Sequence, residues 1–460
     1  MNILKALYRD FFKTDASVVA PIAGSGSARR YYRLVSEAGS AIGVAGVDAY
    51  ENATFIYLAE VLRRHGVSVP QIYAVSQDSM AYLQQDLGDA SLFSLLNSDN
   101  ASGLVRQVME LLPDFQFCPG IDNRRLYPVS VMDGRHVMWD LNYFKYCFLK
   151  PAGVSFDENG LETDFQNFTS SLLDRQPFGL MYRDCQSRNV MYHGGQLWWI
   201  DFQSARRGPV LYDLASFLWQ AKAGFSTSFR HEMSEVYLER LCPHTDMDIA
   251  SLRSLLPDMV LLRTLQVLGA YGLRGRTERK AHFVESIPSA LSNADELQEQ
   301  GVLDAYPSLK AAIKSVVALP RFHKYDSGGK LVVSVFSFSY KKGYPEDLSG
   351  NGGGFMFDCR SLHNPGRYEQ YKPLTGRDAA VCEFLENRGE IQPFLQNAWA
   401  LTDPAIERYI SRGFSSLQIG FGCTGGRHRS VYSADATARH IEAVFGDRVI
   451  VRLEHREQDF

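Results

Sequence analysis

The hydrophobic periodicity of this chain changes twice, and the order of these patterns constrains the fold more than any other feature. Within the first 90 residues, short alternating segments separated by Gly- and Ser-rich turns predict β-strands, with one helix among them. The strands are predicted at 17–23, 30–36, 41–47 and 81–85, and the helix at 54–64; the stretch at 71–75 follows Pro70 and is assigned to no element. From residue 91 to about 318 the apolar residues recur at helical spacing, so a small β-rich lobe precedes a larger helical lobe.

A second change follows a polar segment with paired glycines at 321–330, which is predicted to be a linker. Beyond it, strands are predicted at 331–337, 356–359 and 416–421, and helices at 379–385 and 433–445. Alternating strands and helices predict a separate α/β domain of roughly 130 residues. The predicted boundaries are therefore 1–320 for the first domain, 321–330 for the linker and 331–460 for the second domain.

Composition excludes several classes of function. The net charge of −4 gives no global basic excess of the kind that nucleic acids or membrane surfaces attract. The first 12 residues are too short and too charged for a signal peptide, and no segment approaches the roughly 18 apolar residues of a membrane span. Seven cysteines without a CxxC pair argue against a metal cluster or a disulfide framework and favour a cytoplasmic location.

The strongest chemical pattern combines two aspartates and an asparagine. Four residues separate Asp184 from Asn189, and Asp201 follows a predicted hairpin. Phosphoryl transfer needs one carboxylate near the attacking hydroxyl, and another carboxylate and an amide oxygen to hold Mg²⁺ against ATP. We interpret Asp184 as the catalytic base and Asn189 and Asp201 as metal ligands. Asp and Asn also cap ordinary turns, but the flanking Arg183 and the sequence Ile-Asp-Phe at 200–202 favour the catalytic interpretation.

The β-rich lobe contains a loop that suits a nucleotide. Its backbone N–H groups could approach phosphates closely, because glycine leaves the backbone exposed. A plain hairpin turn is the alternative, and the position of the loop ahead of Asp184 favours nucleotide binding. The loop residues are Gly24, Ser25, Gly26 and Ser27.

These motifs resemble the aminoglycoside-phosphotransferase-like branch of the protein-kinase-like fold, and within it the N-acetylmuramate/N-acetylglucosamine anomeric kinase family. The matching stretches are 24–34, 84–89, 182–191 and 200–218. The resemblance covers residues 1–320 and implies a bilobal α+β kinase domain. It implies that Asp184 is the base, that Asn189 and Asp201 bind Mg²⁺, and that ATP phosphorylates the anomeric hydroxyl of an amino sugar in cell-wall recycling.

Two departures from that family keep a second function open. The strand at 41–47 lacks the lysine that kinases use to hold the α- and β-phosphates. Tyr182 and Cys185 stand where many relatives carry histidine. A non-catalytic regulator, a pseudokinase scaffold with an RNA or metabolite adapter, is therefore the alternative to an enzyme. The arginines that could replace the lysine are Arg29, Arg30 and Arg33.

A second chemical pattern lies between the last predicted strand and the last predicted helix. A glycine-rich loop before a helix N-terminus attracts anions, and neighbouring cations strengthen this attraction. The Cys-x5-Arg spacing also occurs in cysteine phosphatases, so a catalytic loop and a binding loop both remain open. The loop residues are Cys423, Thr424, Gly425, Gly426, Arg427, His428, Arg429 and Ser430.

The second domain resembles the C-terminal domain of the RNase adapter protein RapZ, over residues 330–460. The matching stretches are 356–368, 371–378, 422–431 and 452–457. The resemblance implies a domain that binds an amino-sugar phosphate, glucosamine-6-phosphate, and regulatory RNA. Asp358, with the neighbourhoods of Asn364 and Arg377, is expected to complete the sugar-phosphate pocket. The fold class expected for the whole chain is thus a protein-kinase-like bilobal domain followed by a small α/β domain with a phosphate-binding loop.

The charge of the second domain decides between its two expected ligands. Residues 328–460 contain 16 Lys and Arg against 16 Asp and Glu, so the domain lacks the net basic character of a nucleic-acid binder. We therefore favour binding of a small sugar phosphate and retain RNA as the alternative partner.

Overall fold

The computed structural model of the chain describes residues 1–22, 29–278, 280–319, 322, 328–345 and 354–458. They form two compact units, and each is described by itself. The predicted linker lies mostly outside the described residues, so the predicted domain boundaries stay predictions. The first unit comprises Met1–Ala270 and Ser286–Phe322, and the second comprises Tyr271–Glu285 and His323–Phe460.

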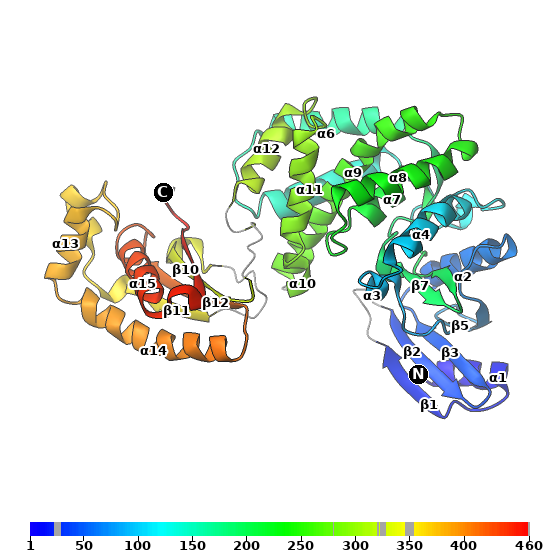
Figure 1. Cartoon of the computed structure of the whole chain (residues 1–460), viewed down its shortest axis with the longest axis horizontal. Helices are drawn as coiled ribbons and strands as arrows, with labels where there is room; N and C mark the ends of the chain where they lie inside the picture. Colours follow the sequence, from blue (N-terminus) through cyan, green and yellow to red (C-terminus); the bar gives the residue numbers. More distant parts are fainter. Residues whose placement is uncertain (23–28, 279, 320–321, 323–327, 346–353, 459–460) are drawn as a thin grey trace. The chain divides into compact units, whose positions relative to one another are not determined.

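The first unit begins with a five-stranded antiparallel sheet in the order β1-β2-β3-β5-β4 (Figure 1). Strands β1, β2, β3 and β5 lie within two residues of their predicted ends, so the alternating pattern located four of the five, and β4 covers the stretch at 71–75 to which no element was assigned. The strands are β1 (Val18–Ile22), β2 (Arg30–Ser36), β3 (Gly39–Ala45), β4 (Ile72–Val75) and β5 (Ala81–Gln85).

Helix α2 (Ala49–Arg64) connects β3 to β4 and begins five residues before the predicted start at 54. The Asp48 carboxylate accepts hydrogen bonds from the N–H groups of Tyr50 and Glu51, at 2.9 and 3.3 Å. This cap satisfies donors that have no partner inside the helix, and it therefore fixes the first turn, which carries Glu51.

Helix α1 (Asn2–Phe12) was not predicted, and tertiary packing explains why it forms. Leu4 and Tyr8 are completely buried against Leu34 and Leu83 of the sheet. The Tyr8 hydroxyl also donates to the Gly39 carbonyl at 2.6 Å. An isolated helix of this length is marginal in water, so the sheet supplies most of its stability.

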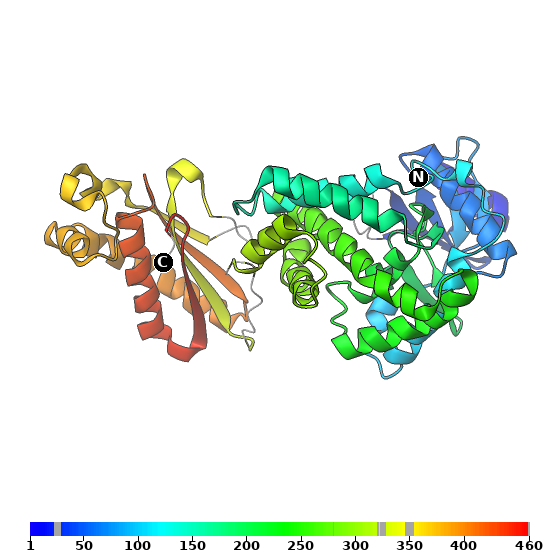
Figure 2. The ribbon, with the colours of Figure 1, turned by 90° about the horizontal axis from the view of Figure 1, so that it is seen from above.

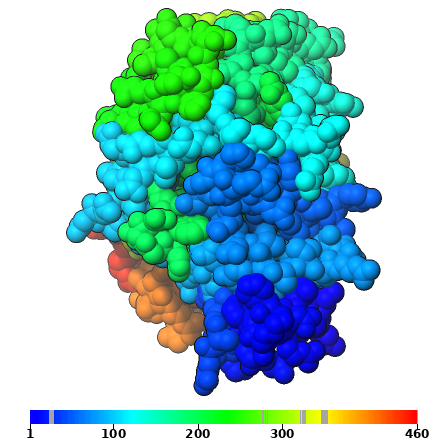
Figure 3. Space-filling view, turned by 90° about the vertical axis from the view of Figure 1, so that its right-hand side faces the viewer, coloured from blue at the N-terminus to red at the C-terminus, as the bar shows by residue number. Residues whose placement is uncertain are grey.

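The rest of the first unit is mainly helical, as predicted, and Figure 2 shows its long helices gathered together. In Figure 3 the dark blue N-terminal residues form one end of the visible face of this unit and the green helical residues form the other. Two short antiparallel pairs, β6–β9 and β7–β8, lie within the helical part. The helices and strands are α3 (Leu92–Leu95), α4 (Ala101–Gln116), α5 (Gly134–Phe144), α6 (Glu158–Leu173), β6 (Phe178–Met181), β7 (Val190–His193), β8 (Gln196–Trp199), β9 (Arg206–Pro209), α7 (Leu211–Leu218), α8 (Thr227–Leu241), α9 (Ile249–Tyr271), α11 (Ile287–Glu299) and α12 (Pro307–Val317).

The second unit contains a parallel four-stranded sheet in the order β11-β12-β10-β13. Its core lies on the face that carries Leu417, Ile419 and Phe421, and α14 and α15 contribute side chains to this core. The predicted α/β fold is confirmed. The elements are α10 (Ala281–Val284), β10 (Leu331–Ser339), β11 (Gly354–Asp358), α13 (Ala379–Asn387), α14 (Ile391–Ser411), β12 (Ser416–Cys423), α15 (Arg429–Phe445) and β13 (Val449–His455).

The opposite face of that sheet has glycines where side chains would collide. A Cβ atom at Gly420 would lie 2.3 Å from the Met356 sulfur, and one at Gly422 would lie 2.5 Å from the Tyr340 ring. These glycines therefore allow large side chains of β10 and β11 to cover β12 closely. Among the described residues, no helix is both long enough and apolar enough to cross a membrane.

Candidate active site and anion-binding loop

A strand, a loop and a hairpin carry the three residues predicted for phosphoryl transfer. β6 leads into the loop that contains Asp184, and the loop ends at Asn189, where β7 begins. β7 and β8 pair antiparallel, and the Ile200 N–H donates to the Asn189 carbonyl at 3.0 Å. The hairpin therefore brings Asn189 and Asp201 close together at its open end.

The backbone beside Asp184 is held in a conformation that non-glycine residues rarely adopt. Arg183 has a φ of 78°, and such residues persist only where their surroundings hold them. The carboxylate of Asp213 on α7 accepts hydrogen bonds from the N–H groups of Tyr182 and Arg183, at 2.8 and 2.9 Å. The Arg183 guanidinium makes two bonds of 2.8 and 2.9 Å to Asp140 on α5. Two helices thus fix the position of Asp184.

Asp213 is completely buried, and sequence reasoning assigned it no role. Burial raises the pKa of its carboxyl to about 7, although hydrogen bonds from the Gln116 side chain and the two loop N–H groups favour the ionised form. One signal was available, since a lone aspartate occurs in the otherwise apolar helix α7. A buried carboxyl that accepts backbone N–H bonds positions a loop rather than reacting with a substrate.

The amide of Asn189 and the carboxylate of Asp201 fit a divalent cation. The Asn189 side-chain N–H group donates to the Asp184 carbonyl at 2.9 Å, and no described residue donates to its Oδ1. The Asp201 side chain is 38% exposed, and its φ of 62° is again strained. Two such oxygen ligands suit Mg²⁺, which commonly takes one or two protein ligands and completes its shell with water and substrate phosphates. Among the described residues, no three His, Cys, Asp or Glu side chains are placed together so that they could hold a metal ion.

Tyr182 and Cys185, which replace histidines of many relatives, are both completely buried. The Tyr182 hydroxyl donates to the carbonyl groups of Ile200 and Asn189. Burial raises the pKa of the Tyr182 hydroxyl and of the Cys185 thiol, so both groups remain protonated near neutral pH. Tyr182 thus connects the loop of Asp184 with the end of the hairpin that leads to Asp201.

Guanidinium groups surround Asp184. Its charge acts favourably on Arg183, Arg206 and Arg263, which come from the loop, β9 and α9. Burial and then the repulsion from Arg183 lower the pKa of Arg206 to about 10. Asp140 also acts on Arg183 and Arg206, and Asp213 on Arg263, so these arginines and aspartates together form a network of opposite charges.

The predicted nucleotide loop, Gly24, Ser25, Gly26 and Ser27, lies outside the described residues. β1 and β2 on either side of it pair antiparallel, with Ile22 opposite Tyr31. β3 carries no lysine, so the departure noted in the sequence applies to the strand itself.

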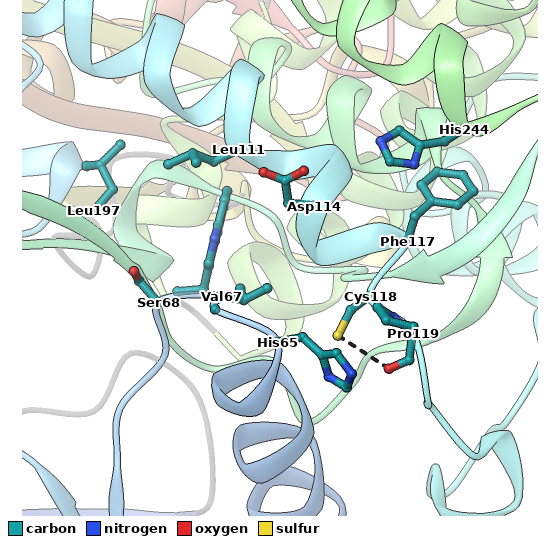
Figure 4. Close-up of a pocket in the computed structure, with 12 residues that line it drawn as sticks. His65, Val67, Ser68, Leu111, Asp114, Phe117, Cys118, Pro119, Leu197 and His244 are labelled. Carbon is teal, nitrogen blue, oxygen red and sulfur yellow. Dashed lines mark hydrogen bonds between the residues drawn. The ribbon is translucent and has the colours of Figure 1, made fainter.

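A hollow of about 270 Å³ occurs elsewhere in the first unit (Figure 4). It lies where the ends of α2 and α4 approach β8, and its lining includes a stacked pair, Phe117 and His244. None of the predicted catalytic or metal-binding residues lines it. Its other lining residues are His65, Gly66, Val67, Ser68, Leu111, Asp114, Cys118, Pro119, Leu197 and Trp199.

In the second unit, the predicted anion loop connects the end of β12 to the start of α15. Cys423, the last residue of β12, is 3% exposed, and its sulfur lies 3.1 Å from the Ser430 hydroxyl. Burial opposes ionisation of this thiol, but hydrogen bonds from Ser430 and from the Arg427 N–H, and the charge of Arg429, outweigh it, so the pKa of Cys423 is lowered.

The two arginines and the histidine of this loop bind backbone carbonyl groups of neighbouring loops, and burial lowers the pKa of His428, so this ring is mainly neutral near neutral pH. Arg427 donates to Pro373 and Leu374 at 2.7 and 3.0 Å, and His428 lies 2.9 Å from the Tyr371 carbonyl oxygen. Arg429, which is 4% exposed, donates to the carbonyl groups of Arg360 and Leu362 at 3.1 and 2.8 Å. Partners within the protein therefore account for charges that the sequence had suggested would require an anion.

The residues expected to complete the pocket fall into two groups. Asp358 and Asn364 lie on the side of the loop, because Asp358 pairs with Gly422 in the sheet and Gly366, just after Asn364, approaches His428. The carboxylate of Asp358 is already bound by Arg360, which lowers its pKa. The Arg377 guanidinium instead lies against Asp435 and His455.

The sheet with its accompanying helix, the helical part, and the hairpin with Asp184, Asn189 and Asp201 define the class of kinase-like phosphotransferases. The family model described as "Phosphotransferase enzyme family" matches residues 18–249, which is just over half of the chain. The chain belongs to this family. The model described as "RapZ C-terminal domain" matches residues 331–459.

Similar curated proteins match less than half of this chain. A nucleotide-binding protein of Paramagnetospirillum magneticum is 40% identical over 134 residues, which are 29% of this chain and 41% of that protein. One from Xanthomonas axonopodis pv. citri is 34% identical over 183 residues, which are 39% of this chain and 62% of that protein. The chain thus spans about half the length of these relatives.

Solved structures with a similar fold include a choline kinase from Cryptosporidium parvum, with 11% identity and a TM-score of 0.46. That match covers 68% of this chain and 99% of the other chain. A macrolide 2′-phosphotransferase from Brachybacterium faecium has 15% identity and a TM-score of 0.43, with coverage of 63% and 96%.

Proposed function

We propose that the first unit, within residues 1–320, transfers the γ-phosphoryl group of ATP to the anomeric hydroxyl of an amino sugar. The acceptors we propose are N-acetylmuramate and N-acetylglucosamine, in cytoplasmic cell-wall recycling. One observation carries this proposal: Asp184 is fixed by Asp213 and Asp140, while Asn189 and Asp201 present oxygen ligands beside it. Membership of the phosphotransferase family supports the reaction, and the resemblance of the sequence motifs supports the acceptor.

The chemistry follows from the proposed roles. The Asp184 carboxylate accepts the proton of the acceptor hydroxyl as the hydroxyl oxygen bonds to the γ-phosphorus of ATP; the bond from that phosphorus to ADP breaks, and ADP leaves. Asn189 and Asp201 would hold Mg²⁺, which would neutralise charge on the phosphates.

For the second unit, within residues 331–460, we propose a receptor for an amino-sugar phosphate. The N–H groups of the 423–430 loop and the N-terminus of α15 supply the anion site. Arg429 donates to carbonyl groups, which argues against the cysteine-phosphatase alternative, in which the arginine must bind the phosphate. The equal numbers of acidic and basic residues favour a sugar phosphate over RNA.

The rival function is a non-catalytic regulator, and the missing lysine of β3 is the observation that favours it. Turnover tests both functions. Full-length protein with ATP and Mg²⁺ would be incubated with N-acetylmuramate, N-acetylglucosamine and other small hydroxyl compounds, and phosphorylated products measured by mass spectrometry. We expect a phosphorylated amino sugar from the wild type and none from Asp184→Asn. Nucleotide binding without turnover on any acceptor would favour the regulator.

A further inference from the structure

The residue that replaces the missing lysine can be located in the first unit. Kinases place a lysine on the third strand, where it contacts the nucleotide phosphates and pairs with a glutamate on the following helix. Here that helix is α2, and its first turn carries Glu51. No long basic side chain occurs at this position, because β3 ends at Ala45 and is followed by Gly46 and Val47.

Glu51 nevertheless has a cationic partner. The Arg29 guanidinium lies 3.0 Å from the Glu51 carboxylate, and the Arg29 side chain is only 2% exposed. Arg29 stands immediately before β2, and the sheet register places Arg30 opposite Ala45. Arg29 therefore lies beside the end of β3, close to the position of the strand lysine in other kinases (Figure 1 shows β2, β3 and α2).

The close approach at this point depends on a glycine. A Cβ atom at Gly46 would lie 2.3 Å from the side-chain amide nitrogen of Asn52. The Gly46 N–H donates to the Met80 carbonyl at 2.8 Å. A larger residue at this position would require the Asn52 side chain to shift. The side chain that reaches Glu51 therefore belongs to Arg29, next to β2, and not to a residue of β3.

The Arg29 guanidinium also faces the proposed metal site. Its second terminal nitrogen lies 4.0 Å from the Asp201 carboxylate. One guanidinium therefore stands between the glutamate of the helix and the aspartate of the hairpin. The planar guanidinium can donate to Glu51 through one nitrogen and to a phosphate oxygen through another. A lysine ammonium has only one nitrogen from which to donate.

The other two arginines named from the sequence have different partners or exposure. Arg33, in the middle of β2, donates to Asp86 at 2.8 Å and to Asp89 at 2.8 Å and has no ion pair with Glu51. Arg30 is exposed at the sheet surface. Among these three residues, Arg29 alone reaches both Glu51 and Asp201 in the described part of the chain.

We propose that Arg29, held by Glu51, binds the phosphates of the nucleotide in place of the strand lysine. This inference rests on the proposed function of the first unit as a nucleotide-binding phosphotransferase. It also removes the observation that favoured a pseudokinase, because the cation is supplied from another strand.

The test separates phosphate binding from folding of the lobe. Affinities for ADP and for adenosine would be measured by calorimetry on full-length wild type, Arg29→Ala, Arg29→Lys and Glu51→Gln, with Arg30→Ala as the matched control. We expect Arg29→Ala to weaken ADP binding roughly 10- to 100-fold, the scale of a charge-assisted hydrogen bond, and to leave adenosine binding unchanged. Arg29→Lys should restore part of the loss, Glu51→Gln should reproduce part of it, and Arg30→Ala should match the wild type.

Three outcomes would overturn the proposal: unchanged ADP affinity in Arg29→Ala, equal losses for ADP and adenosine, or no nucleotide binding by the wild type. The KM for ATP gives an independent readout and should rise in Arg29→Ala. If the wild type binds ADP through Arg29 but phosphorylates no acceptor, the proposed function fails and the role of Arg29 stands. If Arg29→Ala phosphorylates the acceptor with an unchanged KM for ATP, the proposed function stands and the role of Arg29 fails.

Discussion

The two candidate sites use their charged residues in opposite ways. In the first unit, the half-buried Arg183 is paired with Asp140, and Asp184 and Asp201 are partly accessible to a substrate and a metal. In the second unit, Arg427, His428 and Arg429 are bound by backbone carbonyl groups of other loops. A cluster of charges in a sequence therefore marks a site in both units, but the structure decides whether the charges meet ligands or hold the site together.

The largest effect is expected at Asp184. If this carboxylate is the base, Asp184→Asn should lower kcat by roughly 10²- to 10⁴-fold, because general-base catalysis contributes on that scale. Affinity for ATP should stay near that of the wild type, which calorimetry can check. Turnover close to the wild-type value would show that Asp184 has another role.

A change at Asp213 tests the hydrogen bonds that hold the loop containing Asp184. Because the folded-state pKa of Asp213 is raised to about 7, its favourable contribution to stability is fully present below the unfolded-state pKa and is lost as pH rises through 7. Asp213→Asn removes this titration. As pH rises from 4 to 8, the free energy of unfolding of the wild type should fall relative to that of the variant. The total fall should not exceed about 4 kcal/mol, because each pKa unit corresponds to about 1.4 kcal/mol.

Urea unfolding of both proteins across that pH range would measure the difference. A constant difference in unfolding free energy would mean that Asp213 is ionised throughout, and that the N–H groups of Tyr182 and Arg183 outweigh its burial. Asp114→Asn, at a partly exposed position of α4, is a matched control that should change this pH dependence little.

Removal of the proposed metal ligand should have an effect of intermediate size. Asp201→Ala should weaken Mg²⁺-dependent ATP binding roughly 10- to 100-fold, since it deletes the carboxylate that links metal and triphosphate. Calorimetry with and without Mg²⁺ isolates this contribution. If the Mg²⁺-dependent part of the affinity were unchanged, the metal would be held elsewhere.

The second unit should respond to Arg429→Ala in both stability and binding. Loss of the bonds to the carbonyl groups of Arg360 and Leu362 should destabilise the loop by about 1.5–3 kcal/mol and weaken glucosamine-6-phosphate binding by a similar amount. Hydrogen–deuterium exchange of β12 and α15 in the full chain would report the first effect, and calorimetric titration the second. Weaker binding with unchanged exchange would instead place Arg429 in direct contact with the ligand.

The smallest effect is expected at Cys423. If the loop is a receptor, Cys423→Ser should change glucosamine-6-phosphate affinity by less than about 1 kcal/mol, because a serine hydroxyl keeps the hydrogen bond to Ser430. The wild type should not hydrolyse an aryl phosphate. Hydrolysis that disappears in Cys423→Ser would make the loop a phosphatase and overturn the receptor proposal.

Much of the fold was predictable because hydrophobic periodicity is a local property. Strands β1, β2, β3, β5, β10, β11 and β12 and helices α13 and α15 lie close to their predicted positions, whereas strands β4 and β13 were not predicted. Helix α1 was missed because Leu4 and Tyr8 gain their stability from strands that come later in the chain. The predicted loop at Gly24 to Ser27 lies outside the described residues, and its role stays a prediction.

The sequence by itself determined the order of the elements and the spacing of Asp184, Asn189 and Asp201, because both depend on residues close together in the chain. Only the tertiary structure decided which charge meets which partner. Arg29 and Glu51 are brought together by the pairing of β2 with β3 and by the packing of α2, and Arg183 meets Asp140 from a helix more than 40 residues earlier. The physical reason is that an ion pair depends on distances of a few ångströms in space, which local sequence spacing does not specify.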